Sequence, residues 1–277
     1  MLRKLFSVVI LVSVIVFLYL AVSNARDRLS ESLAAAPDKF KGVPILVYHK
    51  VNPDPGVGGY GLRVSPRSFE KQMAYLFRSG YSAISLTDLA DHFDRGKPLP
   101  PRPVIITFDD GYLDNYTYAY PILKKYGLTA TIFVVAGTVG GINEFDYNEG
   151  RQPKNKMAGW KELKEMADGG ITIGGHTLRH PHLAGLTHEE ARFEISEGRK
   201  ILEAGLNRPV EVFCYPYGNF EPDIVGMVRE MGFRAAVTTE QGLGRYQEGA
   251  FTLKRIRVRG DYSYSRFLQE LTRYHDS

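Results

Sequence analysis

The chain has 277 residues, of which 44% are hydrophobic and 24% are charged, and this composition excludes a largely disordered protein. The formal net charge is +4, and the first 28 residues account for +3 of it, so the rest of the chain is nearly neutral and gives no reason to expect nucleic-acid binding. The single cysteine, Cys214, excludes an intrachain disulfide framework and a zinc site built on several thiolates. A bound metal must therefore use His and carboxylate ligands.

The chain begins with an apolar segment. Leu5 to Val22 contain 16 apolar residues of 18 and no charge, close to the roughly 20 residues that span a bilayer as a helix. We expect residues 1–22 to be a membrane anchor, with the rest of the protein outside the cytoplasm because Arg3 and Lys4 precede the segment. The alternative is a cleaved secretory signal and a secreted protein, since Ser23-Asn24-Ala25 resembles a cleavage site.

A polar stalk and one domain follow the apolar segment. Residues 23–41 are polar and rich in Ala and Ser, which predicts a stalk, and from residue 42 to residue 277 short β-branched runs alternate with amphipathic stretches. The predicted strands are Ile45 to Tyr48, Ser82 to Ser85, Val104 to Phe108, Ala130 to Val135, Ile171 to Gly174, Val210 to Tyr215, Ala235 to Thr238 and Thr252 to Val258. The predicted helices are Pro66 to Ser79, Asn115 to Tyr126, Trp160 to Ala167, Thr187 to Ala204 (with a capping box at Thr187 and Glu190), Pro222 to Met231 and Ser263 to Tyr274.

This alternation predicts the fold class. Eight strand and helix units in about 235 residues favour an α/β fold of the deformed (β/α) barrel type. A doubly wound open sheet is the alternative, but no Gly-rich dinucleotide motif follows an early strand. In a barrel, the side chains that follow the strands gather at one end, where active sites lie.

Two adjacent carboxylates follow one of the predicted buried strands. The run Val104 to Phe108 ends in Asp109-Asp110-Gly111. One Asp at this position is commonly the cap of the next helix. Two in succession indicate that at least one of them has another task.

A histidine cluster follows another predicted strand. Within Gly174-Gly175-His176-Thr177-Leu178-Arg179-His180-Pro181-His182, two histidines lie four residues apart, a spacing that lets both imidazoles reach one ion. Pro181 favours a turn over a continuing helix. A lone His is most often structural, but three in seven residues beside a Gly-Gly pair favour a metal site.

Two further strand ends carry candidate side chains. Phe213-Cys214-Tyr215-Pro216-Tyr217-Gly218 leaves a strand through a proline and a glycine, a setting in which backbone N–H groups can turn toward a pocket. Cys214 lies inside the strand and is predicted to be a small packing residue rather than a nucleophile. The first strand ends in His49.

Taken together, these stretches resemble the polysaccharide deacetylases, the NodB-like group also called carbohydrate esterase family 4. Residues 107–111, Thr-Phe-Asp-Asp-Gly, match the first family motif, and residues 176–181 match the second, His-Ser/Thr-x-x-His-Pro. The resemblance covers residues 43 to 260 and implies a deformed (β/α) barrel in which Asp109 is the general base. It also implies that Asp110, His176 and His180 bind a divalent metal, usually Zn²⁺, and an Asp with two His and an open position is the composition of a catalytic zinc site.

Two departures from the family pattern affect the implied roles. The third motif of many members carries an Arg that orients the base, whereas Cys214 stands at that position here, and Arg255 or Arg257 is the candidate replacement. The late Leu-x-His motif is missing, and the start Leu-Val-Tyr-His at residues 46–49 resembles a subgroup with permuted motif order that includes enzymes deacetylating poly-β-1,6-N-acetylglucosamine. On this reading His49 is the general acid. The candidate substrate and oxyanion contacts are Tyr215, Pro216 and Tyr217.

The functional hypothesis is metal-dependent N-deacetylation of a polysaccharide that contains N-acetylglucosamine: poly-β-1,6-N-acetylglucosamine, a chitooligosaccharide or peptidoglycan. A metal-activated water attacks the acetamide, with Asp109 as base, His49 as acid and the Tyr217 N–H on the oxyanion. The alternatives are a non-catalytic cell-surface glycan-binding module and a metal-dependent esterase or amidase acting on another acyl bond. The sequence leaves the oligomeric state open.

Two polar loops are candidate substrate contacts. Thr138 to Gly159 is long for a compact domain. It is either a rim or lid, with Asn143, Tyr147 and Asn148 meeting sugar hydroxyls, or a tolerated surface insertion. Residues 50–65, which include Tyr60, have the same two interpretations.

Overall fold

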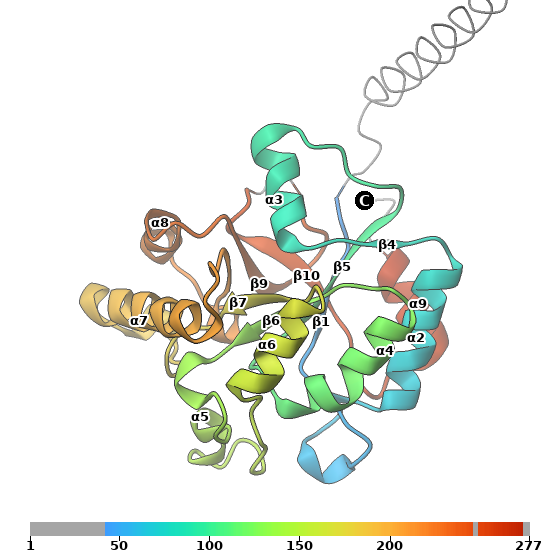
Figure 1. Cartoon of the computed structure of the whole chain (residues 1–277), viewed down its shortest axis with the longest axis horizontal. Helices are drawn as coiled ribbons and strands as arrows, with labels where there is room; N and C mark the ends of the chain where they lie inside the picture. The colour runs from blue at the N-terminus through green and yellow to red at the C-terminus, as the bar shows by residue number, and fades with distance from the viewer. Residues whose placement is uncertain (1–41, 246–248, 274–277) are drawn as a thin grey trace, which may run out of the picture. The chain divides into compact units, whose positions relative to one another are not determined.

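Parallel strands close into a ring in the computed structural model, which describes residues 42–245 and 249–273 of the chain (Figure 1). The ring order is β1-β5-β6-β7-β8-β9-β10, and it closes because β1 pairs in parallel with both β5 and β10. This closure confirms the (β/α) barrel and excludes the doubly wound open sheet. The ring strands are β1 (Ile45–Tyr48), β5 (Pro103–Phe108), β6 (Thr131–Val134), β7 (Thr172–Gly175), β8 (Val212–Cys214), β9 (Ala235–Gln241) and β10 (Leu253–Arg257).

The barrel is deformed because the predicted strand Ser82 to Ser85 lies outside the ring. It is reduced to β4 (Ser82–Ala83), which pairs with Pro103–Val104 at the start of β5. β1 pairs directly with the rest of β5, Ile105–Phe108, and among the described strands β4 pairs with β5 alone, so β4 is not part of the closed ring. The described ring therefore has seven strands rather than eight. Two further short strands that the sequence did not predict pair with each other, β2 (Lys50–Val51) and β3 (Arg63–Val64).

Helices cover the outside of the ring, largely where the sequence predicts them. The predicted helix Asn115 to Tyr126 is divided into a π turn, Asn115–Ala119, and a following α-helix, because Pro121 has no N–H to continue the ladder. The capping box is confirmed, since Thr187 and Glu190 exchange hydrogen bonds. The helices are α2 (Pro66–Arg78), α3 (Leu86–Arg95), α4 (Tyr120–Lys125), α5 (Glu144–Tyr147), α6 (Trp160–Asp168), α7 (His188–Leu206), α8 (Pro222–Glu230) and α9 (Tyr264–Thr272), of which α3 and α5 were not predicted.

Two buried layers of side chains hold the barrel together. Alternate strand residues point into the ring, where Ile45, Ile105 and Phe133 belong to one apolar cluster. Leu86 and Leu89 of α3 belong to the same cluster, so this helix closes the N-terminal end of the barrel. The other strand faces pack against the outer helices in a second, larger cluster. Polar side chains are thereby confined to the C-terminal end of the barrel interior.

The predicted anchor and stalk, residues 1–41, lie outside the described residues. Among the helices that the structure does describe, none is long and apolar enough to cross a bilayer. The anchor and the stalk stay predictions from sequence.

Candidate active site

Seven of the side chains singled out in the sequence line a cleft of about 340 Å³ at the C-terminal end of the barrel: His49, Asp109, Asp110, His176, His180, Tyr217 and Arg257. His49 follows β1, Asp109 and Asp110 follow β5, and His176 follows β7. Parallel strands present their C-terminal ends at the same end of a barrel, which is why segments far apart in sequence converge here. Neither Asp109 nor Asp110 caps a helix.

The backbone around this cleft adopts the left-handed region that non-glycine residues rarely enter. Gly111, with φ of 85°, supplies part of this shape, and a Cβ there would come within 3.2 Å of Val134. Four of the six described non-glycine residues with positive φ lie at the site: Asp110, Thr177, His180 and Tyr217.

Asp110, His176 and His180 form a compact group of potential metal ligands. The Nε2 atoms of both histidines lie 3.5 Å from Oδ1 of Asp110, and all three side chains are buried. One ligand atom of each lies within 4.8 Å of the others. One carboxylate and two imidazoles match the His and carboxylate ligand sets of catalytic zinc sites.

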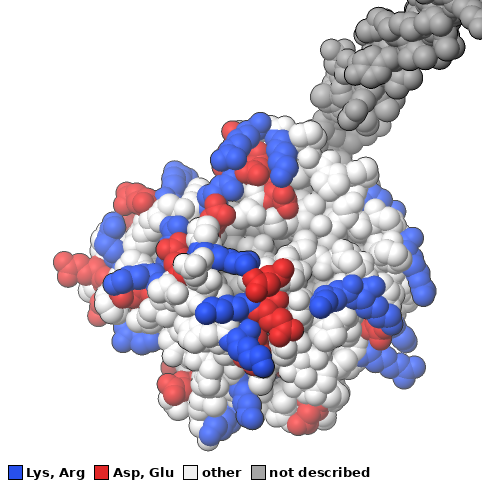
Figure 2. Space-filling model, in the orientation of Figure 1, with Lys and Arg blue, Asp and Glu red and all other residues white. Residues whose placement is uncertain are grey.

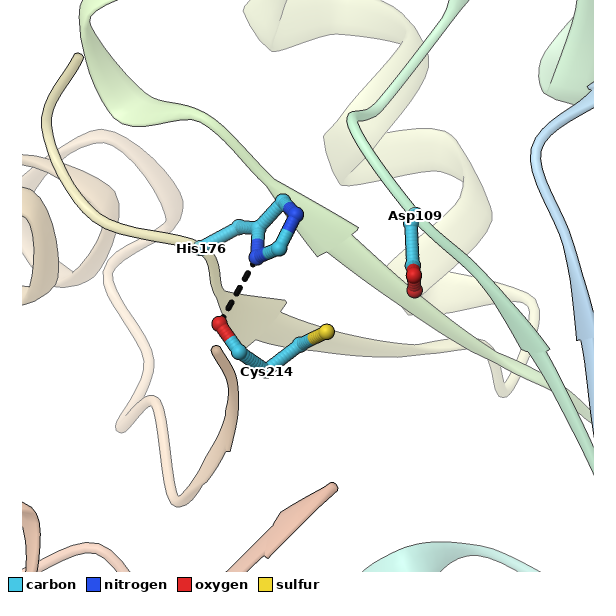
Figure 3. Close-up of side chains that lie close together, drawn as sticks. All are labelled: Asp109, His176 and Cys214. Atoms are coloured by element: carbon cyan, nitrogen blue, oxygen red, sulfur yellow. Dashed lines mark hydrogen bonds between the residues drawn. The ribbon is translucent and has the colours of Figure 1, made fainter. Parts of the chain in front are cut away.

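A hydrogen bond outside this group fixes the tautomer of His176. Its Nδ1 lies 2.7 Å from the carbonyl oxygen of Cys214 and must donate to it (Figure 3). A neutral imidazole that donates from Nδ1 keeps its lone pair on Nε2, the atom that faces Asp110. The donor set and its orientation therefore fit a divalent metal.

Asp109, His176 and Cys214 form a second group whose ligand atoms also lie within 4.8 Å of one another (Figure 3). This group is a poor metal site for two reasons. Burial raises the pKa of the Cys214 thiol, which favours the neutral thiol over the thiolate that binds metal. The Arg255 guanidinium already contacts both Asp109 and the Cys214 sulfur, so a cation there would meet an existing positive charge.

The pKa shifts agree with ligand roles for Asp110 and His180, whereas burial lowers the pKa of His176 but Cys214 and Asp110 outweigh it and raise that pKa. Burial opposes a charge on Asp110, but contact with the His176 ring and the positive field of the neighbouring histidines hold its pKa well below the usual value. Burial, together with His176, lowers the pKa of His180 to about 3. An ionised carboxylate and a neutral imidazole are the forms that bind metal.

Arg255 holds Asp109 in a bidentate ion pair. Its Nη1 and Nη2 each donate to one carboxylate oxygen of Asp109 over 2.7 Å, and both side chains are buried. Arg255 Nε donates to the Thr238 carbonyl oxygen over 2.7 Å, which fixes the guanidinium plane. Burial opposes ionisation of Asp109, but Arg255 outweighs it and lowers the Asp109 pKa.

Cys214 and the two candidate arginines have distinct places in the structure. Cys214 is fully buried, as expected of a packing residue, and its sulfur lies 3.3 Å from Nη2 of Arg255. Arg257 lines the cleft instead, and its Nη2 donates to the Gly61 carbonyl oxygen over 3.1 Å. The guanidinium beside Asp109 is therefore that of Arg255.

His49 lies beside Asp109 in the cleft. Its Nε2 lies 4.0 Å from Oδ2 of Asp109, and its side chain is 18% exposed. Burial lowers the pKa of His49, with Arg255 and Arg257 acting in the same direction and Asp110 and Asp109 in the opposite one. A lowered pKa makes the protonated ring a stronger proton donor.

The three residues after Cys214 divide between cleft and core. Tyr217 lines the cleft and stacks on His182 with ring centroids 3.8 Å apart. Tyr215 is fully buried, with its ring packed against Phe213 and Phe220, and Pro216 is buried too. Of the three, only Tyr217 is among the residues that line the cleft.

The long loop after β6 supplies part of the cleft wall. Asp146, Arg151 and Gln152 line the cleft, and sequence reasoning missed all three. Asn143, which we expected to meet sugar hydroxyls, is fully buried and instead binds the loop to itself, donating to the Pro153 carbonyl oxygen over 3.0 Å. The other expected contacts of the two polar loops are not among the cleft-lining residues: Tyr147, Asn148 and Tyr60.

Lys50 joins the two loops that form this rim. Its buried Nζ donates to the Val57 carbonyl oxygen over 2.7 Å and to Oε1 of Gln152 over 3.4 Å. The ammonium also lies 4.5 Å from the centre of the Tyr112 ring. Asn155 donates to the same Val57 oxygen over 3.0 Å, so both loops converge on one carbonyl group.

Comparison with known proteins relates this geometry to a family. A family model described as polysaccharide deacetylase matches residues 96–236. YxkH of Bacillus subtilis (strain 168), named as a polysaccharide deacetylase, is 33% identical over 230 residues, which cover 83% of this chain and 76% of that protein. The poly-beta-1,6-N-acetyl-D-glucosamine N-deacetylase of Staphylococcus aureus (strain MRSA252) is 28% identical, and the matched region covers 72% of this chain and 68% of that protein. The structure of Streptococcus pyogenes deacetylase PplD in complex with acetate superposes with a TM-score of 0.71 at 26% identity, covering 83% of this chain and 98% of that one.

Proposed function

Because this chain belongs to the polysaccharide deacetylase family, we propose that its substrate is poly-β-1,6-N-acetylglucosamine and that its cleft removes the acetyl groups hydrolytically. The names of similar proteins from Staphylococcus aureus and Escherichia coli support this choice of glycan. The observation that carries the reaction is the arrangement of one ion-paired Asp, one His and a separate Asp-His-His group in a single cleft.

The reaction divides between the two sides of the cleft. Water adds to the acetamide carbonyl carbon, the carbon–nitrogen bond breaks, and acetate and a free amine leave. A divalent metal held by Asp110, His176 and His180, Zn²⁺ in our proposal, would supply Lewis-acid polarisation and acidify water. The residues of the chain must then place the protons.

Asp109 is the proposed general base. Its carboxylate is ionised because Arg255 lowers its pKa, so it can accept a proton from the attacking water. Each carboxylate oxygen of Asp109 accepts one hydrogen bond from Arg255, so the lone pairs left to accept a proton are those that do not face the guanidinium.

His49 is the proposed general acid. Its Nε2 lies 4.0 Å from Oδ2 of the proposed base and both residues line the cleft, so the two groups can serve one bound acetamide. The ring donates its proton to the departing nitrogen, which leaves as an amine. The backbone N–H of Tyr217, where the chain turns in the left-handed region, is the proposed donor to the oxyanion.

The test is a substrate panel read by free amine and acetate formation. The purified protein is chelated, dialysed and reloaded with Zn²⁺, then given β-1,6-linked N-acetylglucosamine oligomers, chitooligosaccharides, peptidoglycan and an O-acetylated glycan. We expect the β-1,6-linked oligomers to give the highest rate. Faster ester hydrolysis would assign the cleft to an esterase, and binding of glycan with no acetate release would assign it to a non-catalytic module.

We also propose that residues 1–22 anchor the enzyme in a membrane, with residues 23–41 as a stalk and the catalytic domain outside the cytoplasm. The support is the uncharged apolar run from Leu5 to Val22. Fractionation of cells expressing the full chain tests this. Recovery of the intact chain in the membrane fraction is expected, and a shortened chain in the medium would show cleavage instead.

A further inference from the structure

A second hollow lies on the side of the barrel, and it is larger than the catalytic cleft. It has a volume of about 530 Å³ and runs along α2. α4 and α9 both pack against α2 (Figure 1). Tyr126, which follows α4, and Tyr264 of α9 line the hollow. It shares no lining residue with the catalytic cleft. We call it the α2 groove.

The α2 groove presents cations that have no partner in the described part of the chain. Arg67, Lys71 and Arg78 line it, are exposed, and make no hydrogen bond or ion pair with any described residue. Spacings of four and seven residues place them along one stripe of the helix, about 16 Å from end to end. Basic side chains gather over α2 and α4 on the right of Figure 2.

The one acidic side chain in the α2 groove is already neutralised. Glu70 accepts a hydrogen bond from Lys125 and another, over 3.4 Å, from the Tyr126 hydroxyl. Its pKa is lowered by the Lys125 hydrogen bond, so it stays ionised and paired. The net field of the groove is therefore positive and directed at solvent.

Aromatic rings form the apolar part of the same groove. Tyr264 is 46% exposed and meets Tyr75 edge to face, with ring centroids 6.2 Å apart. Tyr126 lines the groove too, and its ring lies 5.9 Å from that of Phe77 on α2. Tyrosine presents an apolar ring face and a polar hydroxyl, which suits the apolar faces and hydroxyl edges of sugar rings.

From the three unpaired cations, the aromatic walls and the concave shape, we propose that the α2 groove binds an acidic polysaccharide, one that carries carboxylate groups along its chain. The charge is complementary to such a polymer and not to the uncharged glycan proposed for the catalytic cleft. A lipid surface is the less suitable occupant, since the lining has no Leu, Ile, Phe or Trp side chain to insert into a bilayer. The groove would hold the enzyme on an acidic matrix while the cleft acts on a different strand.

The experiment measures binding of tetragalacturonate by calorimetry, with chitotetraose and phosphatidylglycerol vesicles as comparison probes. The test variants are Arg67→Gln/Lys71→Gln and Tyr264→Ala. The control is Lys161→Gln/Lys164→Gln on α6, which removes the same charge from exposed lysines elsewhere. We expect saturable binding of tetragalacturonate that weakens with salt, and about five- to tenfold weaker binding in the double variant because exposed charge pairs each contribute modestly.

Activity on a short neutral substrate separates this proposal from the proposed catalytic function. Both groove variants should deacetylate short β-1,6-linked oligomers as the parent does, because they do not touch the cleft. No saturable binding of tetragalacturonate, an equal loss in the Lys161/Lys164 control, or binding to vesicles without binding to the acidic glycan would each overturn the proposal.

Discussion

Arg255 reaches Asp109 from a different strand than the one on which the family pattern places its arginine. The small side chain of Cys214 leaves room for this, since its sulfur lies 3.3 Å from the guanidinium. A second arginine at position 214 would put two guanidinium groups in one buried space. The cysteine and the displaced arginine are therefore two parts of one arrangement, in which β10 supplies the charge that β8 lacks.

Replacing the base tests its role directly. Asp109→Asn keeps the shape but cannot accept a proton, and we expect deacetylation to fall by roughly 10²- to 10⁴-fold. Because the proposed metal ligands are separate residues, bound zinc measured by atomic absorption should be nearly unchanged. Full activity, or loss of zinc in parallel with activity, would contradict the assignment.

Replacing the arginine should shift the pH profile. Arg255 lowers the Asp109 pKa, so Arg255→Met raises it, and the acid limb of the plot of kcat/KM against pH should move to higher pH. Arg255→Lys keeps a positive charge without the bidentate geometry and should shift the limb less. Cys214→Ser is the matched control and should leave the limb in place. An unmoved limb in a folded Arg255→Met variant would show that Arg255 does not set this pKa.

At the scale of elements, the conformation of the two rim loops depends on Lys50 of β2, which bonds to both. Lys50→Met keeps the length of the side chain but removes its bonds to Val57 and Gln152. We expect KM to rise by roughly tenfold with little change in kcat, because hydrogen bonds from a charged group order the cleft wall and take no part in the chemistry. The control is Lys154→Met, since Lys154 is exposed and lies on the loop that carries Gln152. Equal effects on kcat and KM would place Lys50 in the reaction instead.

A buried carboxyl where β2 meets the π turn should make stability depend on pH. Burial raises the pKa of Asp114 to about 7, against hydrogen bonds from Asn52 and Val51. The folded state therefore binds this proton more tightly than the unfolded state, and the resulting stability is complete below about pH 4 and is lost as the pH rises to about 7. The free energy of unfolding of the wild type and of Asp114→Asn can be measured with urea at a series of pH values. The difference between the two should fall by up to about 1.4 kcal/mol per pH unit over this range. A constant difference would contradict the raised pKa.

The sequence predicts the buried strands and the residues that follow them better than it predicts α3, the partner of Asp109 or the rim loops. Runs such as Val104 to Phe108 predict strands because they are buried on both faces, and motif residues after them converge because parallel strands end together. α3 was missed although Ser85 and Asp88 form a capping box, a sequence signal that marks the start of this helix. Arg255 as the partner of Asp109 could be proposed but not chosen over Arg257, because both lie on the same face of β10 and the choice depends on their depth along the strand. The rim residues Asp146, Arg151 and Gln152 could not be identified, since loop conformation has no periodic pattern.

The whole molecule should gain stability from a metal held between strands. Asp110 follows β5, whereas His176 and His180 follow β7, so an ion bound to all three links two ring segments. Adding Zn²⁺ to chelated protein should raise Tm in proportion to the logarithm of its concentration. His180→Ala should remove most of this rise in a thermal scan while leaving the apo Tm close to that of the parent. An unchanged response in that variant would place the binding site elsewhere.

The pairing of β1 with both β5 and β10 has a consequence for biosynthesis. The strand that carries His49 is made first, yet one of its two neighbours is the last strand of the ring to be made. Until β10 is made, the ring stays open between β9 and β1, and the carboxylate of Asp109 has no guanidinium to face. Because the chain is synthesised from its N-terminus, the proposed acid, the proposed base and the proposed ligand group are all made before Arg255. A chain interrupted before residue 255 would carry both matched family motifs, residues 107–111 and 176–181, and still lack the partner of its proposed base.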